Sequence, residues 1–210
     1  MKLMVLGATG AVGREVLELA ARDGRFESIV APTRRPLPAR AGLVNPVWPM
    51  TLPLPEDAAW QVDALICCLG STLRKAGSRA AFRQVDHDLV LAAAARARAG
   101  GARTCVLNSS LGADPQSGNF YLRTKGETER DLADIGFERL VYVRPSLIDA
   151  GREEVRPAEW LGIRVARVLR PLIPDRYKPV TPEKIAQTML NAVDGLPGIY
   201  AIENQEILRG

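Results

Sequence analysis

The first part of the chain constrains its fold more than any other segment. An apolar run at residues 3–6 ends at Gly7, and glycine returns at Gly10 and Gly13 while apolar residues recur at helical spacing over residues 11–22. Glycines between a strand and a helix permit a tight turn and let N–H groups at the helix N-terminus approach a phosphate. The segment therefore predicts a strand, a dinucleotide-binding turn and a helix, with a glycine turn that binds no ligand as the alternative.

The rest of the chain repeats this alternation of strand and helix. Apolar runs predict strands at residues 28–31, 43–47, 63–68, 103–107, 138–143 and 198–202, and helical patterns predict helices at 79–99, 120–134, 157–169 and after Thr181. We expect an α/β fold with a doubly wound, mostly parallel Rossmann sheet and helices on both faces. Residues 1–210 form a single domain in this prediction, and about 145–180 form a small cap on the substrate side.

Charge and composition narrow the class of protein. Lys and Arg exceed Asp and Glu by four in 210 residues and are spread along the chain, which argues against a nucleic-acid-binding surface. Cys67, Cys68 and Cys105 lie in apolar runs and suit neither a disulfide framework nor a metal site. We expect no leader peptide and no membrane span. The prediction is a cytoplasmic protein with a small-molecule substrate, and a homodimer or a protein partner is left open.

Two arginines follow the second predicted strand, where a dinucleotide fold discriminates between cofactors. NAD-specific folds place Asp or Glu there to bind the ribose hydroxyls, whereas this chain has Thr33-Arg34-Arg35. A guanidinium can bind a 2′-phosphate through two hydrogen bonds. Arg34 and Arg35 therefore favour NADP(H) over NAD(H), and two solvated loop cations are the alternative.

A serine, a tyrosine and a lysine follow the strand predicted at 103–107. Ser110 lies in the loop after that strand, and Tyr121 and Lys125 are four residues apart on the next helix, so they share one face. A lysine cation beside a phenol favours proton transfer by the phenol near neutral pH, and a serine hydroxyl can hold a carbonyl oxygen. These residues predict a catalytic set, and a surface Tyr and Lys at helical spacing is the alternative.

Together, these features resemble the short-chain dehydrogenase/reductase superfamily in its atypical branch. Within that branch the chain is similar to the Tat-interacting oxidoreductase-like proteins and their bacterial relatives, from about residue 3 to residue 165. The matching segments include Cys67-Cys-Leu-Gly-Ser-Thr72, Lys75-Ala-Gly77, Val85-Asp-His-Asp-Leu-Val90, Ser117-Gly-Asn-Phe120, Lys125-Gly-Glu127 and Arg156-Pro-Ala-Glu-Trp160.

The resemblance implies a role for each of several residues. NADPH would lie against Gly7, Thr9, Gly10, Ala11, Val12 and Gly13, with Arg34 and Arg35 at the 2′-phosphate, Leu69, Gly70 and Thr72 beside the adenosine and ribose, Lys125 at the nicotinamide ribose, and Pro145 and Ser146 near the nicotinamide. The sequence departs from the family pattern in two places. Cys68-Leu69-Gly70 replaces an Asn-Ala-Gly segment, and Asp86 or His87 stands where many members carry an active-site Asn.

Two functions from different classes follow from these residues. The first is an NADPH-dependent reductase of a small carbonyl or related substrate, with Tyr121 as proton donor. The second is a redox sensor or protein-interaction scaffold that binds NADP(H) without turnover, because the resemblance includes a regulatory relative. Glu159 and Trp160 either line the substrate pocket or pack in the cap, and the lone His87 is more often a packed residue than a catalyst.

Overall fold

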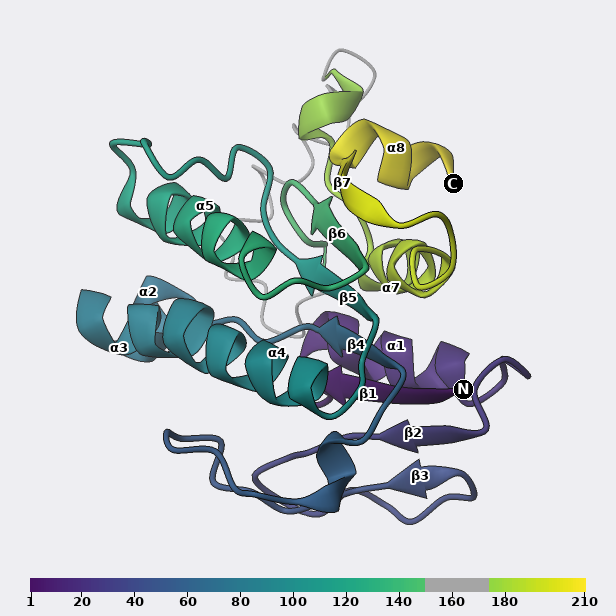
Figure 1. Cartoon of the computed structure of the whole chain (residues 1–210). Helices are drawn as coiled ribbons and strands as arrows, with labels where there is room; N and C mark the ends of the chain where they lie inside the picture. Colours follow the sequence, from purple (N-terminus) through teal and green to yellow (C-terminus); the bar gives the residue numbers. More distant parts are fainter. Residues whose placement is uncertain (150–173) are drawn as a thin grey trace, which may run out of the picture.

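A sheet of seven parallel strands forms the middle layer of the molecule. In the computed structural model, which describes residues 1–149 and 174–210, the strand order is β3-β2-β1-β4-β5-β6-β7 (Figure 1). The strands are β1 (Lys2–Leu6), β2 (Ser28–Val30), β3 (Leu43–Val44), β4 (Ala64–Cys67), β5 (Thr104–Asn108), β6 (Arg139–Arg144) and β7 (Gly198–Glu203). The predicted doubly wound α/β fold is confirmed.

Helices cover both faces of the sheet. Helices α1 (Ala11–Ala20) and α7 (Pro182–Asn191) lie on one face, and α4 (Leu89–Ala99) and α5 (Phe120–Ala133) lie on the other (Figure 1). Three shorter helices complete the described part of the chain: α2 (Leu73–Ala76), α3 (Arg79–Arg83) and α8 (Asn204–Arg209). The described helices include none long and apolar enough to cross a membrane.

Alternating residues of the central strands supply two separate cores. Leu3 and Val5 of β1 pack into the core beneath α1 and α7, whereas Met4 and Leu6 pack into the core beneath α4. All four side chains are fully buried. This alternation follows from the two-residue period of a strand, and burial on both faces explains why the strands are continuous apolar runs.

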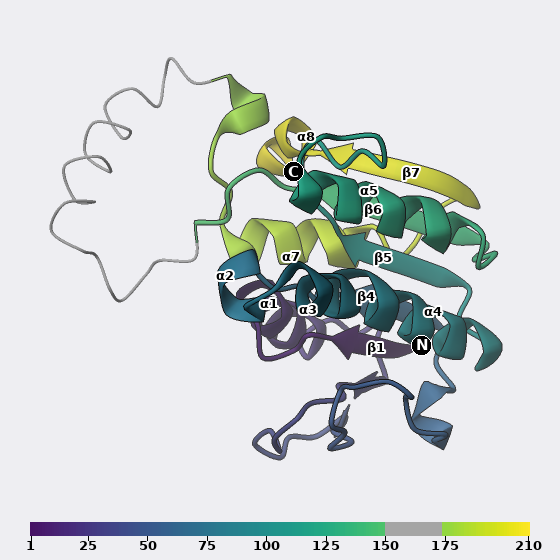
Figure 2. The ribbon, with the colours of Figure 1, turned by 90° about the vertical axis from the view of Figure 1, so that its left-hand side faces the viewer.

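The strand order changes direction between β1 and β4, which places a topological switch point at one edge of the sheet. From β1 the chain goes outward to β2 and β3, and from β4 it goes outward in the other direction to β7. The loops after β1 and β4 therefore diverge, and ligands of doubly wound sheets bind at such a point, beyond the carboxyl ends of the strands. Figure 2 shows α2 at this edge, toward which β1 points.

Several predicted boundaries differ from the structure. The helix predicted at residues 79–99 is divided into α3 and α4 by a π-helical turn, Gln84–Asp88. In the edge strand predicted at 43–47, Leu43 and Val44 pair with β2, and Pro46 interrupts the strand because it has no N–H to donate. Val47 forms a separate parallel bridge with Thr33. Helices α2 and α8 were not predicted. The helix predicted at 157–169 and most of the predicted cap lie outside the described residues.

Candidate cofactor and active site

The glycine turn after β1 packs tightly against its surroundings. Gly7 has a left-handed φ of 77°, and a Cβ on it would lie 2.5 Å from the carbonyl oxygen of Cys68. A Cβ on Gly13 would lie 2.2 Å from the carbonyl oxygen of Gly7. The Gly10 N–H donates to the same Gly7 oxygen at 2.9 Å and closes the turn. Glycine is therefore required at positions 7 and 13 by the path of the backbone.

The N-terminus of α1 is open toward solvent beside this turn. Gly10 is the N-cap and offers no side chain to the first N–H groups, and no acidic residue lies in the first turn. Thr9 and Gly10 are exposed and Ala11 is partly exposed, while Val12 is buried. Free N–H groups and the positive end of a helix dipole bind phosphate oxygens, so this turn fits the pyrophosphate of a dinucleotide.

Arg34 and Arg35 are exposed just beyond β2. Buried Thr33 holds this bend, because its hydroxyl donates to the Arg35 carbonyl oxygen at 2.6 Å and accepts from the Asn45 side chain at 2.8 Å. Strands β1 and β2 are paired in parallel, so the arginines and the glycine turn follow the same edge of the sheet. Neither guanidinium forms an ion pair within residues 1–149 and 174–210. Both arginines fit an anionic ligand.

The loop after β4 brings Gly70 to the middle of the candidate site. A Cβ on Gly70 would lie 3.4 Å from Asp86 Oδ1 and 3.8 Å from Lys125 Nζ, so the loop passes directly over these two groups. Leu69 is partly exposed and Gly70 is exposed. Thr72 caps α2, because its hydroxyl oxygen accepts from the Lys75 N–H at 3.2 Å.

Lys125 is buried and forms an ion pair with Asp86. Its Nζ lies 2.8 Å from Asp86 Oδ1, and the two side chains are 5% and 0% exposed. Burial by itself would lower the pKa of Lys125, but the Asp86 carboxylate and then Tyr121 outweigh it, so the pKa is raised. The lysine therefore stays positively charged at physiological pH in spite of its burial.

Tyr121 lies one helical turn before Lys125, near the start of α5. The side chain of Asn119 caps this helix by accepting from the N–H groups of Tyr121 and Leu122 at 2.9 and 3.3 Å. The Tyr121 ring is partly buried and packs against Phe82, with ring centroids 5.6 Å apart. Tyr121 is one of the groups that raise the pKa of Lys125.

The two serines after β5 have different environments. The Ser109 side chain is buried and donates to Glu129 at 2.5 Å. Ser110 is partly exposed, and its hydroxyl makes only a long contact of 3.4 Å with the Leu111 carbonyl oxygen. Ser110, the predicted catalytic serine, is therefore the one whose hydroxyl remains available to a ligand.

Pro145 and Ser146 follow β6 at the same edge of the sheet. The Pro145 carbonyl oxygen accepts from the Leu111 N–H at 2.8 Å and links the loops after β5 and β6. The Ser146 hydroxyl donates to the Lys178 carbonyl oxygen at 2.6 Å, and its N–H donates to the buried Asn204 side chain at 2.8 Å. Both polar groups of Ser146 thus have protein partners.

The structure distinguishes the two residues suggested for the family's asparagine position. Asp86 faces Lys125, whereas the ring of His87 contacts Asp88 at 2.7 Å and Asp131 at 2.8 Å. His87 therefore joins the π-helical turn to α5 away from the site. The sequence indicated Asp86 as a candidate but not its pairing with Lys125, because these residues are far apart in sequence. Glu159 and Trp160 lie outside the described residues.

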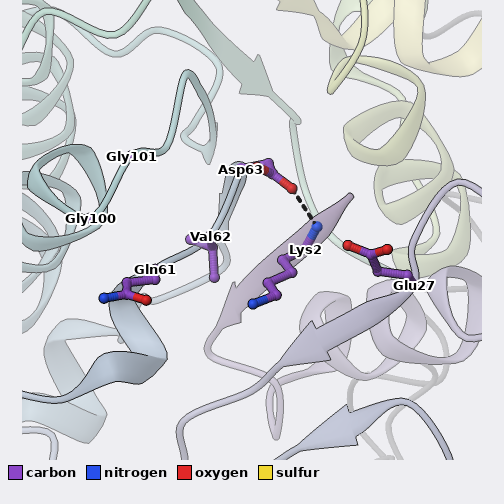
Figure 3. Close-up of a pocket in the computed structure, with 7 residues that line it drawn as sticks. All are labelled: Lys2, Glu27, Gln61, Val62, Asp63, Gly100 and Gly101. Atoms are coloured by element: carbon purple, nitrogen blue, oxygen red, sulfur yellow. Dashed lines mark hydrogen bonds between the residues drawn. The ribbon is translucent and has the colours of Figure 1, made fainter.

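A shallow hollow of about 280 Å³ lies at the opposite edge of the sheet (Figure 3). It is lined by Lys2, Glu27, Gln61, Val62, Asp63, Gly100 and Gly101. Two of these residues are joined by a hydrogen bond of 2.7 Å from the Lys2 N–H to the Asp63 carboxylate. The hollow lies at the amino ends of β1 and β4 and contains none of the predicted site residues.

Comparison with known sequences identifies relatives of this chain. No family model matches it. It is 35% identical over 216 residues to protein HTATIP2 of Rattus norvegicus, covering 98% of this chain and 87% of that protein. It is 32% identical over 178 residues to protein FMP52, mitochondrial, of Candida albicans, covering 80% of this chain and 75% of that protein.

Solved structures share the fold. One is MoeE5 in complex with UDP-glucuronic acid and NAD, with a TM-score of 0.72, 15% identity and coverage of 96% of this chain and 75% of that chain. Another is a short chain dehydrogenase family protein from Francisella tularensis, with a TM-score of 0.64, 13% identity and coverage of 99% and 98%. At such identities the likeness concerns the fold, which is that of NAD(P)-binding dehydrogenases and their relatives.

Proposed function

Because the chain belongs to the family of the HTATIP2 and FMP52 proteins, within the atypical short-chain dehydrogenases/reductases, we propose that it is an NADP(H)-dependent reductase. The substrate class is a small carbonyl or related compound. The observation that carries the proposal is the convergence of Tyr121 and a buried, charged Lys125 at the edge of the sheet that holds the glycine turn.

Residues from four loops would hold the cofactor. The pyrophosphate would bind at the glycine turn, the 2′-phosphate at Arg34 and Arg35, and the adenosine and ribose beside the loop after β4. The residues of this proposed site are Gly7, Thr9, Gly10, Ala11, Val12, Gly13, Arg34, Arg35, Leu69, Gly70, Thr72, Lys125, Pro145 and Ser146. When bound, NADPH supplies a hydride. MoeE5 contains NAD, so the preference for NADP(H) in this chain rests on Arg34 and Arg35.

The chain's own side chains would supply the proton and its control. Tyr121 donates a proton to the substrate oxygen, and the adjacent Lys125 cation stabilises negative charge on the phenol oxygen. The Ser110 hydroxyl donates a hydrogen bond to the same substrate oxygen and fixes its position. The buried environment of Lys125 strengthens these electrostatic effects because little water screens them.

Substitution of Tyr121 tests this mechanism. We expect the wild-type protein to oxidise NADPH, followed by its absorbance, with at least one member of a carbonyl library. Tyr121→Phe should lower kcat by roughly 10²- to 10⁴-fold, because it removes the proton donor, and leave NADPH binding unchanged. Tyr200→Phe is the matched control, since Tyr200 lies on β7 and its hydroxyl donates to the Pro197 carbonyl oxygen.

Two outcomes would contradict the reductase proposal. If Tyr121→Phe leaves turnover unchanged, Tyr121 is not the proton donor. If NADPH binds but no carbonyl is reduced, the result favours a redox sensor or scaffold, whose partner binding should then depend on the redox state of the cofactor.

We propose the cytoplasm as the compartment of this protein, and cell fractionation tests it.

A further inference from the structure

Asp86 is the most completely buried charged side chain in the candidate site. It is 0% exposed and lies on the π-helical turn Gln84–Asp88. One carboxylate oxygen accepts from the Ser71 N–H at 2.8 Å, and the other lies 2.8 Å from Lys125 Nζ. A single carboxylate thus joins the loop after β4 to helix α5.

The surrounding structure orients Asp86 from two sides. The Thr128 hydroxyl contacts the Asp86 carbonyl oxygen at 3.0 Å and the Thr124 carbonyl oxygen at 2.8 Å, so α5 holds the backbone of the turn. His87 ties the outer side of the turn to Asp131 at 2.8 Å. π-Helical turns inside helices occur frequently at functional sites, where they redirect side chains. Here the turn directs Asp86 and His87 to different partners.

A buried ammonium needs a compensating charge. The titratable groups that face Lys125 are Asp86 from the π-helical turn, Tyr121 from its own helix and Cys67 from β4. Burial raises the pKa of the Cys67 thiol to about 11, so this thiol is neutral at physiological pH. Asp86 therefore supplies the negative charge that offsets the cost of burying Lys125.

We propose that Asp86 is a positioning residue, whose carboxylate fixes the Lys125 ammonium and the loop after β4 in one arrangement and so prepares the lysine to bind NADP(H). The importance of this arrangement for the cofactor rests on the proposed function. Gly70 contributes by leaving space above the pair, since its own Cβ would lie 3.4 Å from the Asp86 carboxylate.

The ion pair can be tested without any cofactor. The chain has five lysines, so NMR of protein labelled with 13C at lysine Cε resolves the titration of each one. Lys125→Arg removes one signal and thereby assigns it to Lys125. We expect Lys125 to titrate above an ordinary lysine in the wild type, because the Asp86 carboxylate favours the charged ammonium, and at least one pH unit below an ordinary lysine in Asp86→Asn. Asp86→Glu should keep the wild-type range, because it keeps the carboxylate. An unchanged titration in Asp86→Asn would overturn the proposal.

Binding of NADP⁺ across pH 7 to 9.5 tests the consequence for the site. We expect constant affinity in the wild type and a loss of about twofold or more by pH 9.5 in Asp86→Asn, as Lys125 loses its proton. Asp88→Asn is the matched control, because Asp88 lies on the same turn but contacts His87. Weakening by the same factor at every pH in Asp86→Asn would show that the carboxylate does not keep Lys125 charged in the site, and would overturn the proposal.

Asp86→Glu separates position from charge and serves if Asp86→Asn does not fold. The longer side chain displaces the carboxylate, so we expect at least tenfold weaker NADP⁺ binding with the pH profile of the wild type. Wild-type affinity in Asp86→Glu would overturn the proposal. If the wild-type protein itself does not bind NADP⁺, the proposed function and the Asp86 cofactor role both fail, while the lysine titration still decides whether the pair sets the charge of Lys125.

Discussion

Two buried charged residues on α5, Lys125 and Glu129, are one helical turn apart and differ in how fully their hydrogen-bonding groups are used. Glu129 accepts from the Ser109 hydroxyl at 2.5 Å and from Arg144 Nε at 3.0 Å, and a second Arg144 nitrogen pairs with its other oxygen. Lys125 has three N–H donors and, among the described residues, one ion-pair partner, Asp86.

This difference distinguishes Glu129, a charged residue with a structural role, from Lys125, a charged residue available to a ligand. Glu129 joins α5 to β5 and β6, and Arg144 extends the network to Glu203 at 3.0 Å. Such a saturated network stabilises one arrangement of the core. Lys125 has N–H donors that no described residue accepts. It lies below the exposed Gly70, at the carboxyl ends of the strands, where ligands of such sheets bind. The comparison predicts that loss of the first network affects stability at every pH, whereas loss of the second pair affects binding and changes how stability depends on pH.

Removal of Arg144 should have the largest effect on stability. Arg144→Met leaves the Glu129 carboxylate buried with Ser109 as its remaining side-chain partner, so we expect a loss of about 3–5 kcal/mol in the free energy of unfolding. Urea denaturation measures it. Arg130→Met is the control, because Arg130 pairs with Asp131 on the surface, and it should cause no measurable change. If Arg144→Met is equally harmless, the Glu129 network is not structural and the comparison fails.

Replacement of Arg34 and Arg35 tests whether their guanidinium groups, which form no ion pair within the described residues, bind the cofactor at the surface. In Arg34→Ala/Arg35→Ala we expect NADPH to bind roughly 10- to 150-fold more weakly, because each hydrogen bond to a charged group contributes about 1.5–3 kcal/mol. NADH should bind as to the wild type, and titration calorimetry compares the two. Arg40→Ala is the control, since Arg40 pairs with Glu18. Equal weakening for both cofactors would show that the arginines do not recognise the 2′-phosphate.

The sequence predicted the sheet well because each central strand is buried on both faces. A continuous apolar run such as residues 3–6 then leaves little ambiguity, and the glycine turn after it determines which edge carries the candidate site. Strand β3 was overestimated because its apolar residues extend past Pro46, which cannot donate to the sheet. Helix α8 was missed, although Glu203 and Glu206 form a capping box with the spacing expected for a helix start.

Only the part of the candidate site that depends on local sequence spacing could be predicted. Tyr121 and Lys125 share a helix, so their proximity follows from four residues of separation. The pairing of Lys125 with Asp86 depends instead on how α5 packs against the π-helical turn, and on where that turn rotates the side chains. Nothing in the alanine-rich run of residues 79–99 signals a π-helical turn, so no periodic pattern distinguished Asp86 from His87.

The smallest expected effect concerns how the free energy of unfolding depends on pH. The wild type and Asp86→Asn should differ clearly in the slope of this dependence. In the wild type the pKa of Lys125 is raised on folding, so its contribution is fully present below the unfolded pKa of about 10.4 and is lost as pH rises through the folded pKa. In Asp86→Asn, burial without the carboxylate lowers the folded pKa. The free energy of unfolding should then increase with pH below 10.4, by up to about 1.4 kcal/mol per pH unit.

Urea denaturation between pH 8 and 10.5 compares these slopes. Asp175→Asn is the control, since it removes the partner of Lys178 in an ion pair of 2.7 Å with a partly exposed lysine and carboxylate, and its slope should match the wild type. Screening by water leaves such a pair with little influence on folding. If the slope of Asp86→Asn also matches the wild type, Lys125 does not depend on Asp86 for its charge, and its spare donors would need another explanation.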